Sequence, residues 1–91
     1  MQRLQAVVTG RVQGVGFRDF VRTEAASRGL TGYVRNGDDG ASVEFVAEGP
    51  ESDLRALLEV IERGPRFARV DGVAAEWSDA SEAFSRFSVE M

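Results

Sequence analysis

The spacing of apolar residues changes several times along this chain, and the order of those changes strongly limits the fold. In residues 3–12 apolar and polar residues alternate, which is typical of a half-buried strand. Its apolar positions are Leu4, Ala6, Val8 and Val12. In residues 17–28 the spacing becomes helical, and the apolar stripe consists of Phe17, Phe20, Val21 and Ala25. Gly29 followed by Leu30 fits a helix C-cap, so we expect a strand followed by a helix.

The next part of the chain predicts a β-hairpin. Residues 30–36 (LTGYVRN) are rich in aromatic and β-branched types, and residues 43–49 (VEFVAEG) form a second strand-like run. The turn cluster GDDGAS separates these two runs. Its carboxylates, Asp38 and Asp39, are expected to stabilise the turn, because two adjacent Asp residues without further ligands rarely hold a metal ion.

A second helix and a fourth strand follow the hairpin. Pro50 suits the first turn of a helix, and Gly64 with Pro65 ends it. The apolar stripe of this helix is Leu54, Leu57, Leu58 and Ile61. The fourth strand is marked by Val70, Val73, Ala75 and Trp77. We expect a bulge in this strand at Asp71 and Gly72.

The resulting order is β-α-β-β-α-β, with a possible short fifth strand at residues 87–90, and it predicts an α+β fold. Each helix carries one apolar stripe, so both should cover the same face of one antiparallel sheet. This is the ferredoxin-like, split βαβ arrangement. A chain of 91 residues is too short for two cores, so we expect a single domain, residues 1–91.

The composition excludes several kinds of chemistry. The chain has no Cys, no His and no Lys, and all 11 basic residues are Arg. Thiolate nucleophiles, imidazole bases, Schiff bases and a Walker-type phosphate lysine are therefore absent. A net charge of −4 argues against nucleic acid as the main partner. No apolar run is long enough to span a bilayer and the N-terminus is too polar for a signal peptide, so we expect a cytoplasmic monomer with no membrane association.

Three signals for an anion site converge at one edge of the expected sheet. A strand–helix–strand crossover leaves its two strands parallel, so the loop after the first strand and Asn36 at the end of the second finish at the same edge. Asn36 shares a strand face with Val34, an expected core position, and therefore points to the side where the first helix begins. It can then face Arg18 across the loop QGVGF.

The loop itself has the features of a phosphate site. Gly14 and Gly16 allow successive backbone N–H groups to curl around an anion. The loop leads into a helix N-terminus, where free N–H groups and the helix dipole favour negative charge. Arg18, in the first helical turn, can bind two phosphate oxygens with its planar guanidinium.

Each of these signals also has a simpler interpretation. Two glycines between a strand and a helix are more often only a tight turn, and the pattern is neither G-x-G-x-x-G nor a P-loop. Arg18 alone could be a solvated surface residue paired with Asp19. Asn36 followed by Gly37 is, taken alone, a hairpin-turn signature. Only the topology, which brings the three signals together, favours the anion site.

Two segments of the chain resemble the signature segments of the acylphosphatase family. They are VTGRVQGVGFR (residues 8–18) and GYVRN…DG…VEFVAEG (residues 32–49), and GPRFARVDGV (residues 64–73) is similar to a third family segment. The resemblance covers nearly the whole chain. It departs from the family pattern at the hairpin, where both Ala41 and Ser42 follow Gly40 before Val43.

The resemblance implies an acylphosphatase-like domain that hydrolyses acyl phosphates to a carboxylate and inorganic phosphate. The phosphate-binding loop falls on Gln13, Gly14, Val15, Gly16, Phe17 and Arg18. The catalytic residues implied are Arg18, which binds the phosphoryl group, and Asn36, which orients the attacking water. Neither a metal ion nor a cofactor is expected. A non-catalytic module that binds phosphate or another small anion, with a regulatory or maturation role, remains the alternative.

Overall fold

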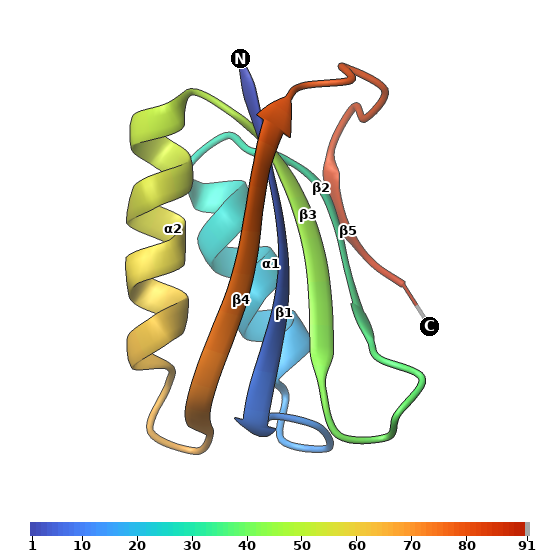
Figure 1. The fold of residues 1–91 in the computed structure, drawn as a ribbon, viewed down its shortest axis with the longest axis vertical. Helices are drawn as coiled ribbons and strands as arrows, with labels where there is room; N and C mark the ends of the chain where they lie inside the picture. Colours follow the sequence, from blue (N-terminus) through green and yellow to red (C-terminus); the bar gives the residue numbers. More distant parts are fainter. Residues whose placement is uncertain (91) are drawn as a thin grey trace.

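The expected order of elements is confirmed in a computed structural model that describes residues 1–90 (Figure 1). These residues form five strands and two helices. Their bounds, in chain order, are β1 (Gln2–Arg11), α1 (Phe17–Ser27), β2 (Thr31–Asn36), β3 (Val43–Gly49), α2 (Glu51–Arg63), β4 (Arg69–Asp79) and β5 (Phe87–Val89). The fold is the ferredoxin-like α+β fold that the spacing of apolar residues predicts.

The strands form one sheet in the order β4-β1-β3-β2-β5. β3 pairs antiparallel with both β1 and β2, so β1 and β2 are parallel and end at the same edge, as expected. The expectation of a wholly antiparallel sheet is wrong at β5, which pairs parallel with β2. β4 ends at the edge of the sheet where β2 begins, and the segment 80–86 crosses the sheet along that edge (Figure 1). β5 therefore starts at the same edge as β2 and runs in the same direction.

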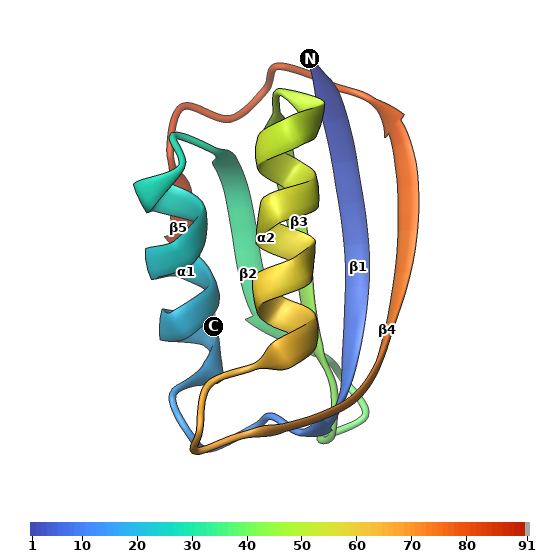
Figure 2. The same ribbon diagram turned by 90° about the vertical axis from the view of Figure 1, so that its left-hand side faces the viewer.

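Both helices lie side by side on the same face of the sheet (Figure 2). Their expected apolar stripes are confirmed, since Phe17, Val21 and Ala25 of α1 are buried, as are Leu54, Leu57 and Ile61 of α2. They pack on the alternating residues Leu4, Ala6 and Val8 of β1, whose side chains are at most 1% exposed. The buried core therefore lies between the helices and one face of the sheet.

Local signals at the ends of elements are also confirmed. At the end of α1 the N–H of Leu30 donates to the carbonyl of Ala25 at 3.1 Å, and the N–H of Gly29 donates to that of Ala26 at 3.0 Å. This is the expected C-cap. In β4 the pairing with β1 skips Asp71, which is the expected bulge. Within residues 1–90, no helix is long and apolar enough to cross a membrane.

Candidate active site

The loop between β1 and α1 is held by core residues at both ends. Val12 and Phe17 are each 1% exposed, so the turn between them projects from two buried positions. Gly14 and Gly16 have φ angles of 73° and 81°, in the left-handed region that glycine occupies without steric cost. Gly16 is the N-cap of α1, and no side chain among residues 1–90 caps this helix end. The first N–H groups of α1 are therefore available to an anion at the loop.

A cavity of about 430 Å³ brings the predicted residues together. It is lined by Val12, Gly14, Gly16, Phe17, Arg18, Asp19, Arg22, Asn36 and Val89. The cavity is thus shared by four parts of the fold: the loop, the first turns of α1, the end of β2, and β5. Arg22 and Val89 are cavity residues that the sequence analysis did not single out. Their signals were weak, because Arg22 is one of several helix arginines and β5 is very short.

Arg18 is free of carboxylate partners among residues 1–90. Its Nη1 donates to the backbone carbonyl of Glu90 at 3.1 Å, which leaves other guanidinium N–H groups for a ligand. The pairing of Arg18 with Asp19 that the simpler interpretation proposed is not seen. Asp19 pairs with Arg22 instead, at 2.8 Å.

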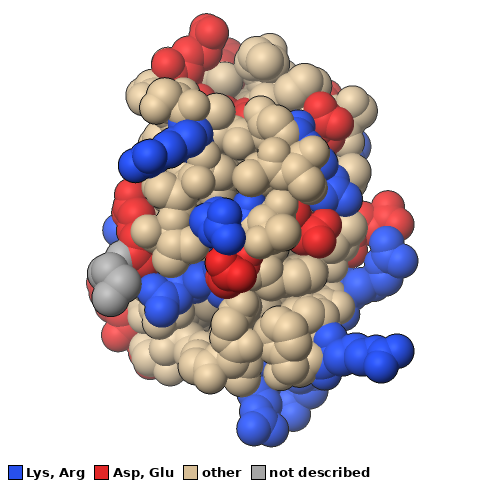
Figure 3. Space-filling model, turned by 180° about the vertical axis from the view of Figure 1, so that it is seen from behind, with Lys and Arg blue, Asp and Glu red and all other residues tan. Residues whose placement is uncertain are grey.

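Positive charge gathers at this end of an acidic molecule. Arg11 ends β1, Arg69 begins β4, and Arg66 lies in the segment that leads to β4, next to the loop end of the fold. Seen from behind, blue arginine side chains project from the lower end of the molecule, where these segments lie (Figure 3). Arg69 is paired with Asp71 at 3.0 Å. Arg11 and Arg66 have no ion-pair partner among residues 1–90, and their charge favours an anionic ligand although the chain carries a net charge of −4.

Asn36 occupies the last position of β2 and lies on the same strand face as fully buried Val34. It pairs with Val43 across the hairpin. The N–H of Gly37 donates to the carbonyl of Ser42 at 2.8 Å, so the turn begins only after Gly37. Asn36 and Gly37 therefore do not form the tip of a two-residue hairpin turn. Asn36 is instead a strand residue that faces the cavity.

Asp39 accommodates the lengthened hairpin. Its Oδ1 accepts hydrogen bonds from the N–H groups of Ala41 and Ser42, both at 2.9 Å, and from the Ser42 hydroxyl at 3.0 Å. These bonds hold the pKa of the Asp39 carboxyl below its usual value. Asp39 is thus the turn carboxylate that was expected. The chain has one residue more than the family pattern between Gly40 and Val43, and this residue lies in the hairpin tip. Asn36 therefore still pairs with Val43.

Two residues of the predicted loop do not line the cavity. Val15 packs against the core. The side chain of Gln13 points to the hairpin, where its Nε2 donates to the carbonyl of Ser42 at 2.7 Å and to that of Gly37 at 3.4 Å. Among residues 1–90, no three His, Cys, Asp or Glu side chains are grouped so as to hold a metal ion.

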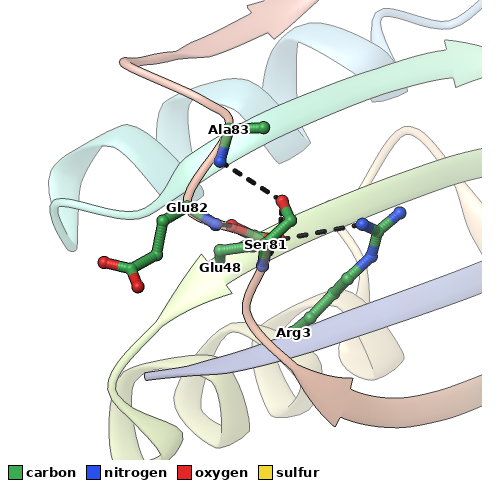
Figure 4. Close-up of polar contacts among 5 residues, drawn as sticks. All are labelled: Arg3, Glu48, Ser81, Glu82 and Ala83. Carbon is green, nitrogen blue, oxygen red and sulfur yellow. Dashed lines mark hydrogen bonds and ion pairs between the residues drawn. The ribbon is translucent and has the colours of Figure 1, made fainter.

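Glu48, which no sequence pattern singled out, is a buried carboxylate at the other end of the sheet (Figure 4). It accepts hydrogen bonds from the N–H and hydroxyl of Ser81, both at 2.8 Å, and from the N–H of Glu82 at 2.9 Å. Arg3 lies 3.8 Å away. Burial raises the pKa of Glu48, but these hydrogen bonds outweigh it and the net pKa is lowered. Glu48 fastens the segment between β4 and β5 and lies far from the loop.

Comparison with known proteins shows the family of the chain. The family model for acylphosphatase matches residues 4–89. The chain is 52% identical to an acylphosphatase of Salinibacter ruber over 88 residues, which cover 97% of this chain and 92% of that protein. The crystal structure of acylphosphatase from Bacillus subtilis superposes with a TM-score of 0.94 at 44% identity, covering 100% of both chains. HypF from T. kodakarensis matches at 34% identity with a TM-score of 0.84, but the match covers only 12% of that longer chain.

Proposed function

The chain belongs to the acylphosphatase family and is a hydrolase of acyl phosphates, and on this premise we propose how its residues divide the reaction. The loop Gln13–Arg18 binds the phosphoryl group of the substrate. Arg18 stabilises the charge on that group, and Asn36 orients the attacking water. The observation that carries the proposal is the single cavity shared by Gly14, Gly16, Arg18 and Asn36.

Binding of the phosphoryl group rests on the loop and on Arg18. Left-handed conformations at Gly14 and Gly16 turn the backbone so that successive N–H groups can converge on an anion. The positive end of the α1 dipole points to the same place. The Arg18 guanidinium adds a planar pair of donors, and its present acceptor, the Glu90 carbonyl, is uncharged, so a phosphate dianion can replace it.

The chemical step is attack of water on phosphorus. The bond between phosphorus and the acyl oxygen breaks, the carboxylate leaves, and a phosphate oxygen of the substrate accepts the proton of the water. A carboxylate is a weak base, so its departure needs no general acid. Catalysis then depends on spreading the phosphoryl charge over the loop N–H groups and Arg18. Asn36 holds the water in line with the leaving group, which removes most of the entropic cost of the encounter.

This mechanism suits the residues available to the chain. No Cys, His or Lys is present to form a covalent intermediate or to act as a base near neutral pH, and Asp19, a carboxylate that lines the cavity, is paired with Arg22 at 2.8 Å. We propose a reaction without metal ion or cofactor. One domain of residues 1–91 supplies every proposed group, and we propose that it acts as a cytoplasmic monomer. An acyl phosphate is the substrate, and inorganic phosphate is both product and competing ligand.

The proposal is tested by turnover of benzoyl phosphate in H₂¹⁸O, with EDTA in one arm and inorganic phosphate in another. We expect activity to persist in EDTA, inorganic phosphate to inhibit competitively, and ¹⁸O to enter phosphate and not benzoate. Loss of activity in EDTA would reveal a required metal ion, and label in benzoate would show attack at the carbonyl carbon. Phosphate binding without any turnover would favour the regulatory alternative.

A further inference from the structure

We propose that Gln13 is a positioning residue that couples the phosphate-binding loop to the hairpin carrying Asn36. This inference rests on the proposed roles of that loop and of Asn36. Gln13 is the first residue of the turn after Val12, and its side chain reaches across to residues 37 and 42. Among residues 1–90, no other side chain from outside the hairpin donates a hydrogen bond to residues 37–42.

The contacts of Gln13 determine which way its amide faces. Both partners, Ser42 at 2.7 Å and Gly37 at 3.4 Å, are backbone carbonyl oxygens, which only accept hydrogen bonds. The NH₂ group must therefore face the hairpin, whichever way an isolated amide could be drawn. The NH₂ group of Gln13 thus bonds to both sides of the hairpin. It does so at the pair Gly37 and Ser42, which lies next to the pair Asn36 and Val43.

The loop has other anchors, but the hairpin has few. Val12 and Phe17 fix the loop in the core, and the N–H of Phe20 donates to the carbonyl of Gly16 at 3.1 Å. The tip of the hairpin is held by its own bonds, chiefly those of Asp39, which stabilise its shape but not its place relative to the loop. Loss of the Gln13 amide should therefore release the hairpin more than the loop.

Release of the hairpin should affect the attacking water and not the bound phosphate. Phosphate should still bind, because the loop N–H groups and Arg18 keep their places. The water held by Asn36 should lose its alignment with the phosphorus, since Asn36 lies at the base of the released hairpin. We therefore expect kcat to fall while the inhibition constant of inorganic phosphate stays near the wild-type value.

The test uses Gln13→Met, which keeps the length of the side chain but removes its donors, and Gln13→Glu. The same changes at Gln5, an exposed residue of β1, are the matched controls. We expect Gln13→Met to lower kcat with benzoyl phosphate by about tenfold or more, as small misplacements of reacting groups do. Both Gln5 variants should match the wild type. Circular dichroism and thermal unfolding check that each variant is folded.

The pH dependence of Gln13→Glu supplies a readout that a purely structural role would not move. At neutral pH its carboxylate faces two carbonyl oxygens and cannot donate, so kcat should be lower than in Gln13→Met. As the pH falls toward the usual Glu pKa of about 4.3, the protonated carboxyl can donate to Ser42, and kcat relative to wild type should recover. Asp38 and Asp39, the carboxylates of the hairpin, are present in both proteins, so the ratio to wild type reports on the added carboxyl group at position 13.

The inference is overturned if Gln13→Met keeps wild-type kcat, or if its phosphate inhibition constant rises in proportion to the loss of kcat. A Gln13→Glu ratio that does not recover in acid also contradicts it, and this arm decides the matter if Gln13→Met does not fold. Arg18→Gln and Asn36→Ala are assayed in parallel. If these two variants remain fully active, the proposed function fails; if they lose activity and Gln13→Met does not, only the role of Gln13 fails.

Discussion

Arg18 and Asn36 reach the same cavity from different elements, the first turn of α1 and the end of β2. The mechanism gives them separate tasks. Arg18 interacts with the phosphoryl group before and during the reaction, whereas Asn36 interacts with the water and contributes only when that water attacks. A group that binds substrate and transition state alike affects affinity, and one that acts only in the transition state affects kcat.

Substitutions at the two positions should therefore differ in their kinetic signature. Arg18→Gln should weaken inhibition by inorganic phosphate and lower kcat/KM by on the order of 10²–10³-fold, as loss of a transition-state donor does. Asn36→Ala should lower kcat with little change in phosphate inhibition. Arg55→Gln, on the exposed side of α2, is the control and should be fully active. Equal effects of Arg18→Gln and Asn36→Ala on phosphate inhibition would contradict the division of tasks.

What the sequence could predict at this scale depended on how far apart the interacting residues are in the chain. Gly14, Gly16 and Arg18 are neighbours, and Asn36 follows from the direction of a crossover and the alternation of a strand. The partners of Gln13 and Glu48 lie 29 and 33 residues away. No local pattern indicates such contacts, and a Glu on the open face of a strand is ordinarily exposed.

At the scale of elements, the strands and helices were predictable because each has its own periodicity and end signals. The parallel pairing of β5 was not, because it depends on where the segment 80–86 crosses the sheet and not on the residues of β5. Glu48 is central to that crossing. Its carboxylate accepts three hydrogen bonds from Ser81 and Glu82, and so orders the segment that leads into β5.

We expect Glu48→Gln to destabilise the protein by about 2 kcal/mol at pH 7, the usual magnitude for hydrogen bonds to a buried charge. Glu44→Gln, on the same face of β3 but partly exposed and paired with Arg35, should cost about 0.5 kcal/mol. The comparison is made by urea unfolding. A smaller effect at Glu48 than at Glu44 would show that the segment is held by other contacts.

The lowered pKa of Glu48 gives this stabilisation a pH dependence. The pKa of this carboxyl is lower in the folded protein than in the unfolded chain. Such a group stabilises the fold fully when the pH is above its pKa in the unfolded chain, and the stabilisation is lost as the pH falls through its pKa in the folded protein. The difference in unfolding free energy between wild type and Glu48→Gln should thus be constant near neutrality and shrink below about pH 4.5, the ordinary value for this carboxyl. A difference that grows in acid would contradict the assignment.

At the scale of the whole molecule, structural and catalytic charges are segregated. The buried Glu48 cluster lies at the end of the sheet where β2 begins, and the arginine-rich end with the loop lies at the other (Figures 1 and 3). The proposed chemistry also uses no residue type that ordinarily titrates near neutral pH.

The rate should accordingly vary little with pH. Carboxyl groups ordinarily titrate near pH 4 and Arg only in strong base, so kcat with benzoyl phosphate should be nearly flat from about pH 6 to pH 9. The measurement is a pH–rate profile at saturating substrate, with circular dichroism at each pH. A bell-shaped profile centred near neutrality would require an acid or base that the mechanism does not contain.

The central claim is that the N–H groups of the loop and the Arg18 guanidinium together bind a phosphate dianion. A crystal structure with inorganic phosphate tests it most directly. The account predicts phosphate oxygens within hydrogen-bonding distance of the loop N–H groups and of Arg18, with the Arg18 side chain turned from the Glu90 carbonyl to the anion. An empty loop in a crystal whose phosphate binds elsewhere, with Arg18 still on that carbonyl, would contradict it.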